Sequence, residues 1–213
     1  MHRADLNQQH IRRGPSDLRQ GLARLPQLHF QLRGAGRRVL GFSAQTPGVA
    51  AAASSITTLD VLVHNAGVAD IGTIEESSVD QWRRTLEANV IAVAELTRVL
   101  LPALRAAGGH VVLINSGAGL RANAGWGSYA ASKFALRAFG DALRLEEPAL
   151  RVTSIHPGRI DTDMQRDIVA GEGDEYDPER FLKASTVARA VLTAVETPSD
   201  AHPTEIVLRP TGR

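Results

Sequence analysis

The 213-residue sequence predicts one doubly wound α/β domain with a single hydrophobic core. Short, continuous runs of Val, Ile and Leu alternate with longer segments that have the period of an amphipathic helix. Such runs are typical of parallel strands buried on both faces of a sheet, and each strand needs a crossover helix to reach the next. Glycine-containing turns follow several runs, at the edge where open parallel sheets bind ligands.

The elements follow in regular order from residue 50 onward. A helix is expected to end within 50–57, and the first complete helix begins at Ser77 or Ser78 and ends near Gly108, with a kink or interruption predicted at Pro102. The polar stretch 171–177 has the composition of a mobile loop. The apolar runs predict strands at 59–64, 110–115, 151–156 and 205–208, and the helical periods predict helices at 78–107, 127–147 and 186–197.

Composition narrows the classes of protein that fit. Hydrophobic residues make up 43% and charged residues 22%, as in ordinary globular proteins, and no apolar run reaches the length of a membrane span. The absence of cysteine excludes disulfides and thiolate chemistry. The N-terminus has no apolar signal region, so we expect a cytoplasmic protein that does not bind membranes.

Charge is distributed unevenly along the chain. Residues 1–50 hold eight arginines and two aspartates, a bias found in nucleic-acid-binding arms and in organelle transit peptides. These charges are scattered, no aromatic residues alternate with them as stacking platforms, and no amphipathic stripe is sustained. We therefore expect no nucleic-acid partner.

Tyr129 and Lys133 carry the clearest chemical signal. They lie four residues apart in the predicted helix 127–147, so their side chains share one face. An ammonium beside a phenol favours the ionised phenol, whose ordinary pKa is about 10, and makes it a usable acid and base. Ser116 follows a predicted strand and supplies a hydroxyl that can hold a carbonyl or alcohol oxygen. Trp126 is either a wall of the same pocket or a packing residue.

Together with three further segments, these residues resemble the short-chain dehydrogenases/reductases. The matching motifs keep that family's order and spacing and cover roughly residues 50–213. They are Asn65-Ala66-Gly67, Asn89, Ser116, Tyr129 with Lys133, and Pro157-Gly158-Arg159-Ile160-Asp161-Thr162.

The resemblance implies a Rossmann-like fold and a role for each motif. Tyr129 would be the general acid/base, Ser116 would hold the substrate oxygen, and Asn89 would hold a water linked to Lys133. Tyr129 and Lys133 would also contact the cofactor, Lys133 at its ribose, and the resemblance places the remaining cofactor contacts in two turns. These contacts are Asn65, Ala66 and Gly67 beside the adenosine ribose, and Pro157, Gly158, Ile160 and Thr162 at the nicotinamide.

The N-terminal part departs from the family pattern. Residues 1–49 contain no recognisable first strand and no Thr-Gly-x-x-x-Gly-x-Gly turn for the pyrophosphate, and Gly34-Ala35-Gly36 has the wrong spacing to replace it. We divide the chain into an atypical Arg-rich segment, 1–49, and a Rossmann-like core, 50–213. Without a first strand, the strand at 59–64 would have an unpaired edge.

Two other chemistries fit the sequence poorly. Ser116 and His156 suggest a serine hydrolase, but Ile114-Asn115-Ser116-Gly117-Ala118 is not a Gly-x-Ser-x-Gly elbow. The seven histidines show no paired spacing suited to a metal, so no metal site is expected.

The sequence thus predicts an oxidoreductase that transfers a hydride between a nicotinamide cofactor and a carbonyl or alcohol substrate. The cofactor is NADP or NAD, with NADP the preferred of the two. The alternative is a non-catalytic or catalytically impaired relative that lacks the phosphate-binding turn. By analogy with the family, pairing through the helices 78–107 and 127–147 would give a homodimer or homotetramer.

Overall fold

The computed structural model describes residues 39–42 and 56–211, and their strands form one parallel sheet. The strands lie in the order β1-β2-β3-β4-β5, so neighbours in the sequence are also neighbours in the sheet. Their bounds are Val39–Phe42 for β1, Val61–His64 for β2, His110–Ile114 for β3, Arg151–Pro157 for β4 and Glu205–Leu208 for β5.

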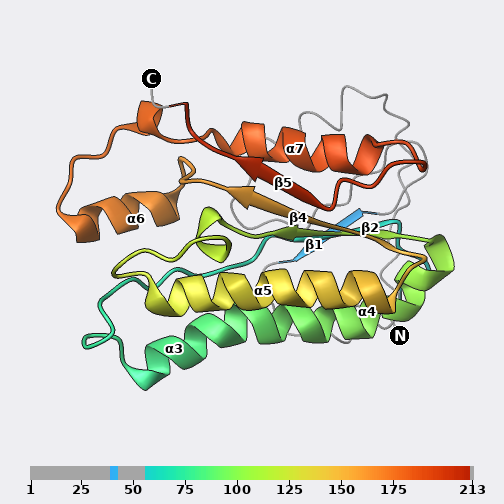
Figure 1. Cartoon of the computed structure of the whole chain (residues 1–213), viewed down its shortest axis with the longest axis horizontal. Helices are drawn as coiled ribbons and strands as arrows, with labels where there is room; N and C mark the ends of the chain where they lie inside the picture. The colour runs from blue at the N-terminus through green and yellow to red at the C-terminus, as the bar shows by residue number, and fades with distance from the viewer. Residues whose placement is uncertain (1–38, 43–55, 212–213) are drawn as a thin grey trace, which may run out of the picture.

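Helices cover both faces of this sheet, which confirms the predicted doubly wound α/β class (Figure 1). In Figure 1, α4 and α5 lie on one side of the strands, with α3 continuing the line of α4, and α7 lies on the other side. The helices are α3 (Val79–Leu86), η1 (a π-helical turn, Glu87–Ile91), α4 (Ala92–Ala107), α5 (Gly127–Glu146), α6 (Asp163–Glu172) and α7 (Ala184–Glu196), with short 3-10 turns η2 (Gly117–Gly119) and η3 (Pro178–Arg180).

The long helical segment begins and ends where the sequence predicts. Ser78 caps α3, its hydroxyl accepting a hydrogen bond from the Gln81 N–H at 3.2 Å. Gly108 ends α4 with a left-handed φ of 56°. The interruption lies at the π-helical turn around Asn89, however, because α4 runs through Pro102 without a break.

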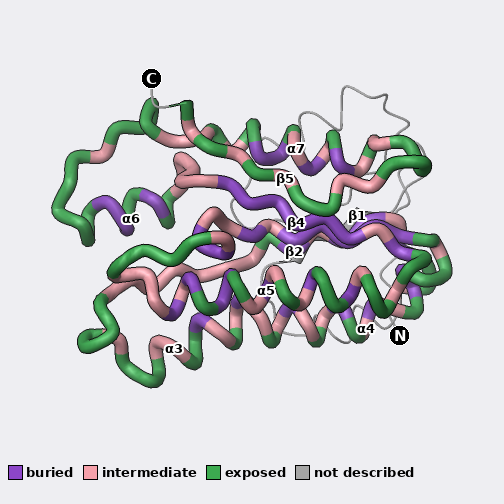
Figure 2. The backbone as a smooth tube through the Cα atoms, in the orientation of Figure 1, coloured by how far each residue is buried: buried purple, intermediate pink, exposed green. Residues whose placement is uncertain are grey.

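Two hydrophobic clusters hold the helices against the sheet, one on each of its faces. Successive strand residues face opposite sides, so Leu113 joins the cluster beneath α4 and α5 while Val112 joins the one beneath α7. Leu100 and Leu104 of α4 lie in the first cluster and are fully buried. Figure 2 shows the result: the central strands are buried, and the outer faces of the helices are exposed.

Strand β1 corrects one prediction. The sequence analysis recognised no strand before residue 50, but β1 pairs in parallel with β2 from Val39 opposite Val61 to Phe42 opposite His64. The expected unpaired edge along 59–64 is therefore wrong. A run of four residues interrupted by Gly41 is too short to stand out as an apolar strand. Gly34-Ala35-Gly36 and most of the helix end expected at 50–57 lie outside the described residues.

Helix α6 corrects a second prediction. The sequence analysis predicts no helix between Thr162 and residue 186, only a mobile stretch at 171–177, yet residues 163–172 form a helix capped by the Thr162 side chain. In the part of the chain that the structure describes, no helix is both long and apolar enough to cross a bilayer.

Candidate active site

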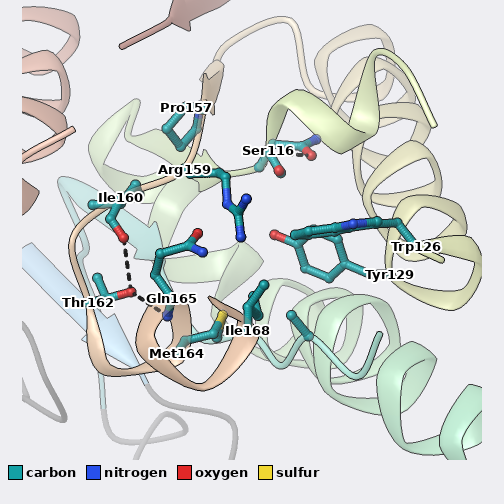
Figure 3. Close-up of a pocket in the computed structure, with 13 residues that line it drawn as sticks. Ser116, Trp126, Tyr129, Pro157, Arg159, Ile160, Thr162, Met164, Gln165 and Ile168 are labelled. Carbon is teal, nitrogen blue, oxygen red and sulfur yellow. Dashed lines mark hydrogen bonds between the residues drawn. The ribbon is translucent and has the colours of Figure 1, made fainter. Parts of the chain in front are cut away.

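The predicted site residues gather at the carboxyl ends of β2, β3 and β4. In a parallel sheet these ends share one edge, so the turns that follow them meet there. A partly open pocket lies at this edge, between the N-terminal end of α5 and helix α6 (Figure 3); its empty space, open solvent included, is about 480 Å³. Ser116, Tyr129, Pro157, Gly158, Ile160 and Thr162 all line it, whereas Lys133, Asn89 and Asn65-Ala66-Gly67 are not among the lining residues.

Tyr129 lies in the first turn of α5, where its phenol reaches the pocket beside Ser116 (Figure 3). The Trp126 ring packs edge-on against the Tyr129 ring, with 5.6 Å between ring centroids. Trp126 also lines the pocket, so it both packs and forms a wall. This contact restricts how far the phenol can swing.

The pKa of Tyr129 is shifted upward, whereas the sequence analysis expects Lys133 to favour the ionised phenol. Burial raises the pKa of the phenol, and the hydrogen bond with the Ser116 side chain lowers that pKa by a smaller amount. The Lys133 Nζ lies 5.6 Å from the centre of the Tyr129 ring, but the shift in this pKa comes from burial and from Ser116. The phenol is therefore protonated at neutral pH, the state needed to donate a proton to a carbonyl oxygen.

Ser116 is held in place through its backbone and side chain. Its N–H donates to the Asn115 Oδ1 at 2.8 Å, and its carbonyl contacts the His156 Nδ1 at 3.1 Å. The Ser116 Oγ accepts a hydrogen bond from the Ala118 N–H, which caps the short turn η2. Because a carbonyl can only accept, the His156 ring carries its proton on Nδ1.

Lys133 is only 4% exposed, one helical turn after Tyr129. Its Nζ donates to the Ile114 carbonyl at 3.1 Å, which ties α5 to the end of β3. Burial lowers the pKa of this ammonium to about 8, so most of it is charged at neutral pH. The Ile114 carbonyl uses one of its three N–H groups, which leaves donors for a bound ligand.

Asn89 lies in the π-helical turn and is completely buried. Its amide bonds both backbone groups of Val68, at 2.8 and 2.9 Å, and its Nδ2 also donates to the Ser132 Oγ at 2.9 Å. Asn89 thus joins the turn after β2 to helix α5. The predicted water between Asn89 and Lys133 stays a prediction.

Gly67 brings the turn after β2 close to the catalytic helix. A Cβ at this position would lie 3.2 Å from the Asn89 Oδ1 and 3.6 Å from the Lys133 Nζ. The first contact is tight and the second is an ordinary van der Waals contact, so a side chain here would crowd the Asn89 amide and touch the Lys133 ammonium. Of the predicted Asn65-Ala66-Gly67 group, Asn65 is exposed and its two neighbours are half-buried.

The wall opposite Tyr129 contains residues that the sequence analysis did not single out. They come from the turn after β4 and from α6, where Arg159, Met164, Gln165 and Ile168 face the pocket (Figure 3). Thr162 caps α6 with its hydroxyl 3.3 Å from the Gln165 N–H. The spacing of Met164, Ile168 and Val169 behind a Thr-Asp pair was the available signal for this short helix.

Comparison with known proteins agrees with this geometry. The family model described as short chain dehydrogenase matches residues 2–173. The chain belongs to the short chain dehydrogenase family. This confirms the resemblance that the motifs at Asn65-Ala66-Gly67, Ser116 and Tyr129 with Lys133 indicate. The match also includes the N-terminal segment, in which we recognise no glycine-rich motif.

Curated relatives of this short chain dehydrogenase include several dehydrogenases. The trans-4-hydroxycyclohexanecarboxylate dehydrogenase of Sinomonas cyclohexanicum is 36% identical over 137 residues, or 63% of this chain and 53% of that protein. The dehydrogenase/reductase SDR family member 7B of Mus musculus is 36% identical over 170 residues, or 74% of this chain and 53% of that protein. The chain spans about half the length of these relatives.

Solved structures of short chain dehydrogenases share the fold. The alcohol dehydrogenase from Thermococcus sibiricus complexed with 5-hydroxy-NADP has a TM-score of 0.69 and 25% identity, covering 80% of this chain and 72% of that one. A short chain dehydrogenase from Burkholderia cenocepacia in complex with NADP has a TM-score of 0.66 and 27% identity, covering 78% and 65%.

Proposed function

We propose that this protein is an NAD(P)-dependent dehydrogenase/reductase acting on a carbonyl/alcohol pair, with Tyr129 as general acid and base. The observation that carries the proposal is the meeting of a protonated phenol and the Ser116 hydroxyl at one pocket, with the buried Lys133 ammonium one helical turn behind the phenol. Family membership and the dehydrogenase relatives support it.

Each side chain has its own role in the proposed reaction. Ser116 donates to the substrate oxygen and holds it against the Tyr129 phenol, which gives its proton to that oxygen during reduction. In oxidation, the phenolate takes the proton from the alcohol. The Lys133 ammonium stabilises this phenolate, and Asn89 holds the turn after β2 against α5 beside Lys133.

A bound nicotinamide supplies the hydride for reduction and accepts it in oxidation. The residues present fit such a group: Lys133 has free donors for a ribose, and Gly67 leaves space beside its Nζ that a Cβ would fill. The remaining proposed contacts are Asn65, Ala66, Pro157, Gly158, Ile160 and Thr162.

Four finer statements belong to the same proposal. We favour NADP over NAD because solved relatives hold NADP or NADPH, although an NAD-dependent oxidoreductase of Mycobacterium tuberculosis is also similar. We infer a cytoplasmic protein. The division of the chain at residue 49 describes where the family motifs begin, since β1 (Val39–Phe42) already belongs to the sheet of the core. A homodimer or homotetramer through the segment 78–107 (α3, η1 and α4) and α5 would cover Ile91, Phe134 and Leu145, which are exposed.

The test measures cofactor binding and turnover separately. Fluorescence titration with NADPH and NADH gives the dissociation constants, and absorbance of the reduced nicotinamide follows reduction of a panel of ketones. Tyr129→Phe keeps the ring but removes the proton, so we expect kcat to fall by about 10²–10⁴-fold while the cofactor Kd changes far less. In the wild type, alcohol oxidation should speed up as pH rises, because oxidation needs the Tyr129 phenolate. Burial raises the pKa of Tyr129, so the rate should keep rising into the alkaline range.

Two results would contradict the proposal. Undiminished turnover in the Tyr129→Phe variant would exclude the phenol as the proton donor. Absence of binding to either nicotinamide at millimolar concentration would favour the alternative of a non-catalytic relative without a phosphate-binding turn.

A further inference from the structure

Two N–H donors on the α6 side of the pocket have no hydrogen-bond partner among the residues that the structure describes. Gln165 is only 5% exposed, yet its Nε2 makes no hydrogen bond to any described residue. The same holds for the Nε of Arg159, at the end of β4. Buried donors are nearly always paired, because leaving one unpaired costs free energy. A ligand oxygen would satisfy them.

Both donors belong to the pocket that contains Tyr129. Arg159 and Gln165 line that pocket, and Figure 3 shows their side chains directed across it toward Ser116 and Tyr129. The backbone of Gln165 is fixed by its hydrogen bonds to Thr162, so the amide extends from a defined helical position. A small molecule could therefore contact the Gln165 amide and the Tyr129 phenol at once.

The charge of this wall is balanced. The Arg159 guanidinium forms an ion pair with Glu172 at the far end of α6, and it lies 5.6 Å from the centre of the Phe181 ring. The neighbouring lining residues, Met164 and Ile168, are apolar. The wall thus offers hydrogen-bond donors in an apolar setting without an unpaired positive charge, which suits a neutral oxygen better than a carboxylate.

We propose that the substrate carries a second neutral oxygen, a carbonyl or hydroxyl, that accepts a hydrogen bond from the Gln165 amide. The reacting oxygen lies at Ser116 and Tyr129, and an apolar carbon skeleton spans the gap against Met164 and Ile168. The substrate class is therefore a small diketone or hydroxyketone. This inference rests on the proposed function for the identity of the reacting end.

The test compares two ketones that differ only in the second oxygen. A cyclohexanedione with carbonyls on opposite ring carbons is matched to cyclohexanone, and ligand-observed NMR with the full chain measures both dissociation constants without cofactor. We expect the wild type to bind the dione about tenfold more tightly. Gln165→Met keeps the length of the side chain but removes the donor, so it should abolish the difference and leave cyclohexanone unchanged.

Two further variants separate this effect from general damage. Gln165→Glu replaces the donor with an acceptor and should bind the dione more weakly than the methionine variant does. Asp167→Asn changes an exposed residue of the same helix and should keep the wild-type ratio. Thermal unfolding of each variant checks that it folds.

The outcomes distinguish the inference from the proposed function. Equal binding of the two ketones by the wild type, no measurable binding of the dione, or the same preference in Gln165→Met overturns the inference. So does tighter binding of oxocyclohexanecarboxylate than of the dione. A Gln165→Met variant that loses NADPH affinity but keeps the ketone ratio would assign the amide to the cofactor. Preference for the dione without turnover of either ketone would instead contradict only the proposed function.

Discussion

The two sides of the pocket differ in burial and in hydrogen bonding. On the α5 side, Lys133 and Asn89 are almost fully buried and held by hydrogen bonds. On the α6 side, Met164 is 40% exposed and the Gln165 Nε2 has no partner among the described residues. The α5 side joins three elements through these contacts, from the turn after β2 to the end of β3. The α6 side has a single helix whose exposed residues pair mainly with nearby ones, such as Arg166 with Asp161.

This difference separates two tasks. Proton transfer needs groups fixed at short distances before the substrate arrives, and the buried network of α5 provides them. Recognition of a substrate needs donors and apolar surface that a ligand can still complete, and α6 provides those. Substitutions on the α5 side should therefore affect catalysis and folding strongly, whereas substitutions on exposed positions of α6 should be tolerated.

The largest expected effect comes from Lys133→Met. Removing the cation leaves the phenolate of Tyr129 unsupported, and we expect kcat to fall by about 10²–10⁴-fold. Lys133→Arg is the matched control, since it keeps the charge. A planar guanidinium does not fit a site built for a compact ammonium, so this variant should regain only part of the activity. Full activity in Lys133→Met would show that the buried network is not needed for catalysis.

The same variant should change stability in the opposite direction. Burial lowers the pKa of Lys133 from 10.5 to about 8, so between these values the unfolded chain binds a proton that the native chain does not. Wild-type stability therefore rises with pH across this window, and below pH 8 the full cost, roughly 3 kcal/mol, is present. Lys133→Met removes that cost, but it also loses the hydrogen bond to Ile114, which offsets about 1–2 kcal/mol of the gain in stability. Urea unfolding should show the variant more stable at pH 7 and its advantage gone near pH 10.

The two sides of the pocket also differ in how well the sequence predicts them. Tyr129 and Lys133 are four residues apart on one helix, so their shared face follows from local geometry alone. The bonds from Asn89 to Val68 and Ser132 join positions 21 and 43 residues apart, and only the folded chain brings them together. The family resemblance predicts Asn89 as a site residue, but not the partners that hold it.

The errors in the fold have a similar cause. β1 is four residues long and contains Gly41, so its strand is visible only through its pairing with β2. α6 has ten residues with a polar exposed face, and its sequence reads as a loop until its apolar residues meet the pocket. Short elements depend on tertiary contacts, whereas the long α5 and the apolar β3 and β4 are specified by their own periodicity.

The next prediction concerns packing on the α5 side. A Cβ at Gly119 would lie 2.5 Å from the Asn115 Oδ1 and 2.8 Å from the Lys133 carbonyl, and the backbone of α5 cannot rotate away. Gly119→Ala should therefore destabilise the protein by about 1–3 kcal/mol and displace Lys133, lowering kcat as well. Denaturant unfolding measures the first effect and ketone reduction the second. Wild-type values of both would mean that the two backbones have room to separate.

The smallest effect is expected at Gly171, a glycine on the α6 side that, unlike Gly119, has open space around it. Gly171 lies within α6, and a Cβ there would have no atom within 4 Å. Alanine favours a helix over glycine, so Gly171→Ala should stabilise the protein by about 0.5–1 kcal/mol without changing kcat. Gly173→Ala is the matched control, because Gly173 ends α6 with a left-handed φ of 75° and alanine there is strained. Thermal unfolding should move the two melting temperatures in opposite directions. A loss of stability at Gly171 would show that α6 is packed as tightly as the catalytic side.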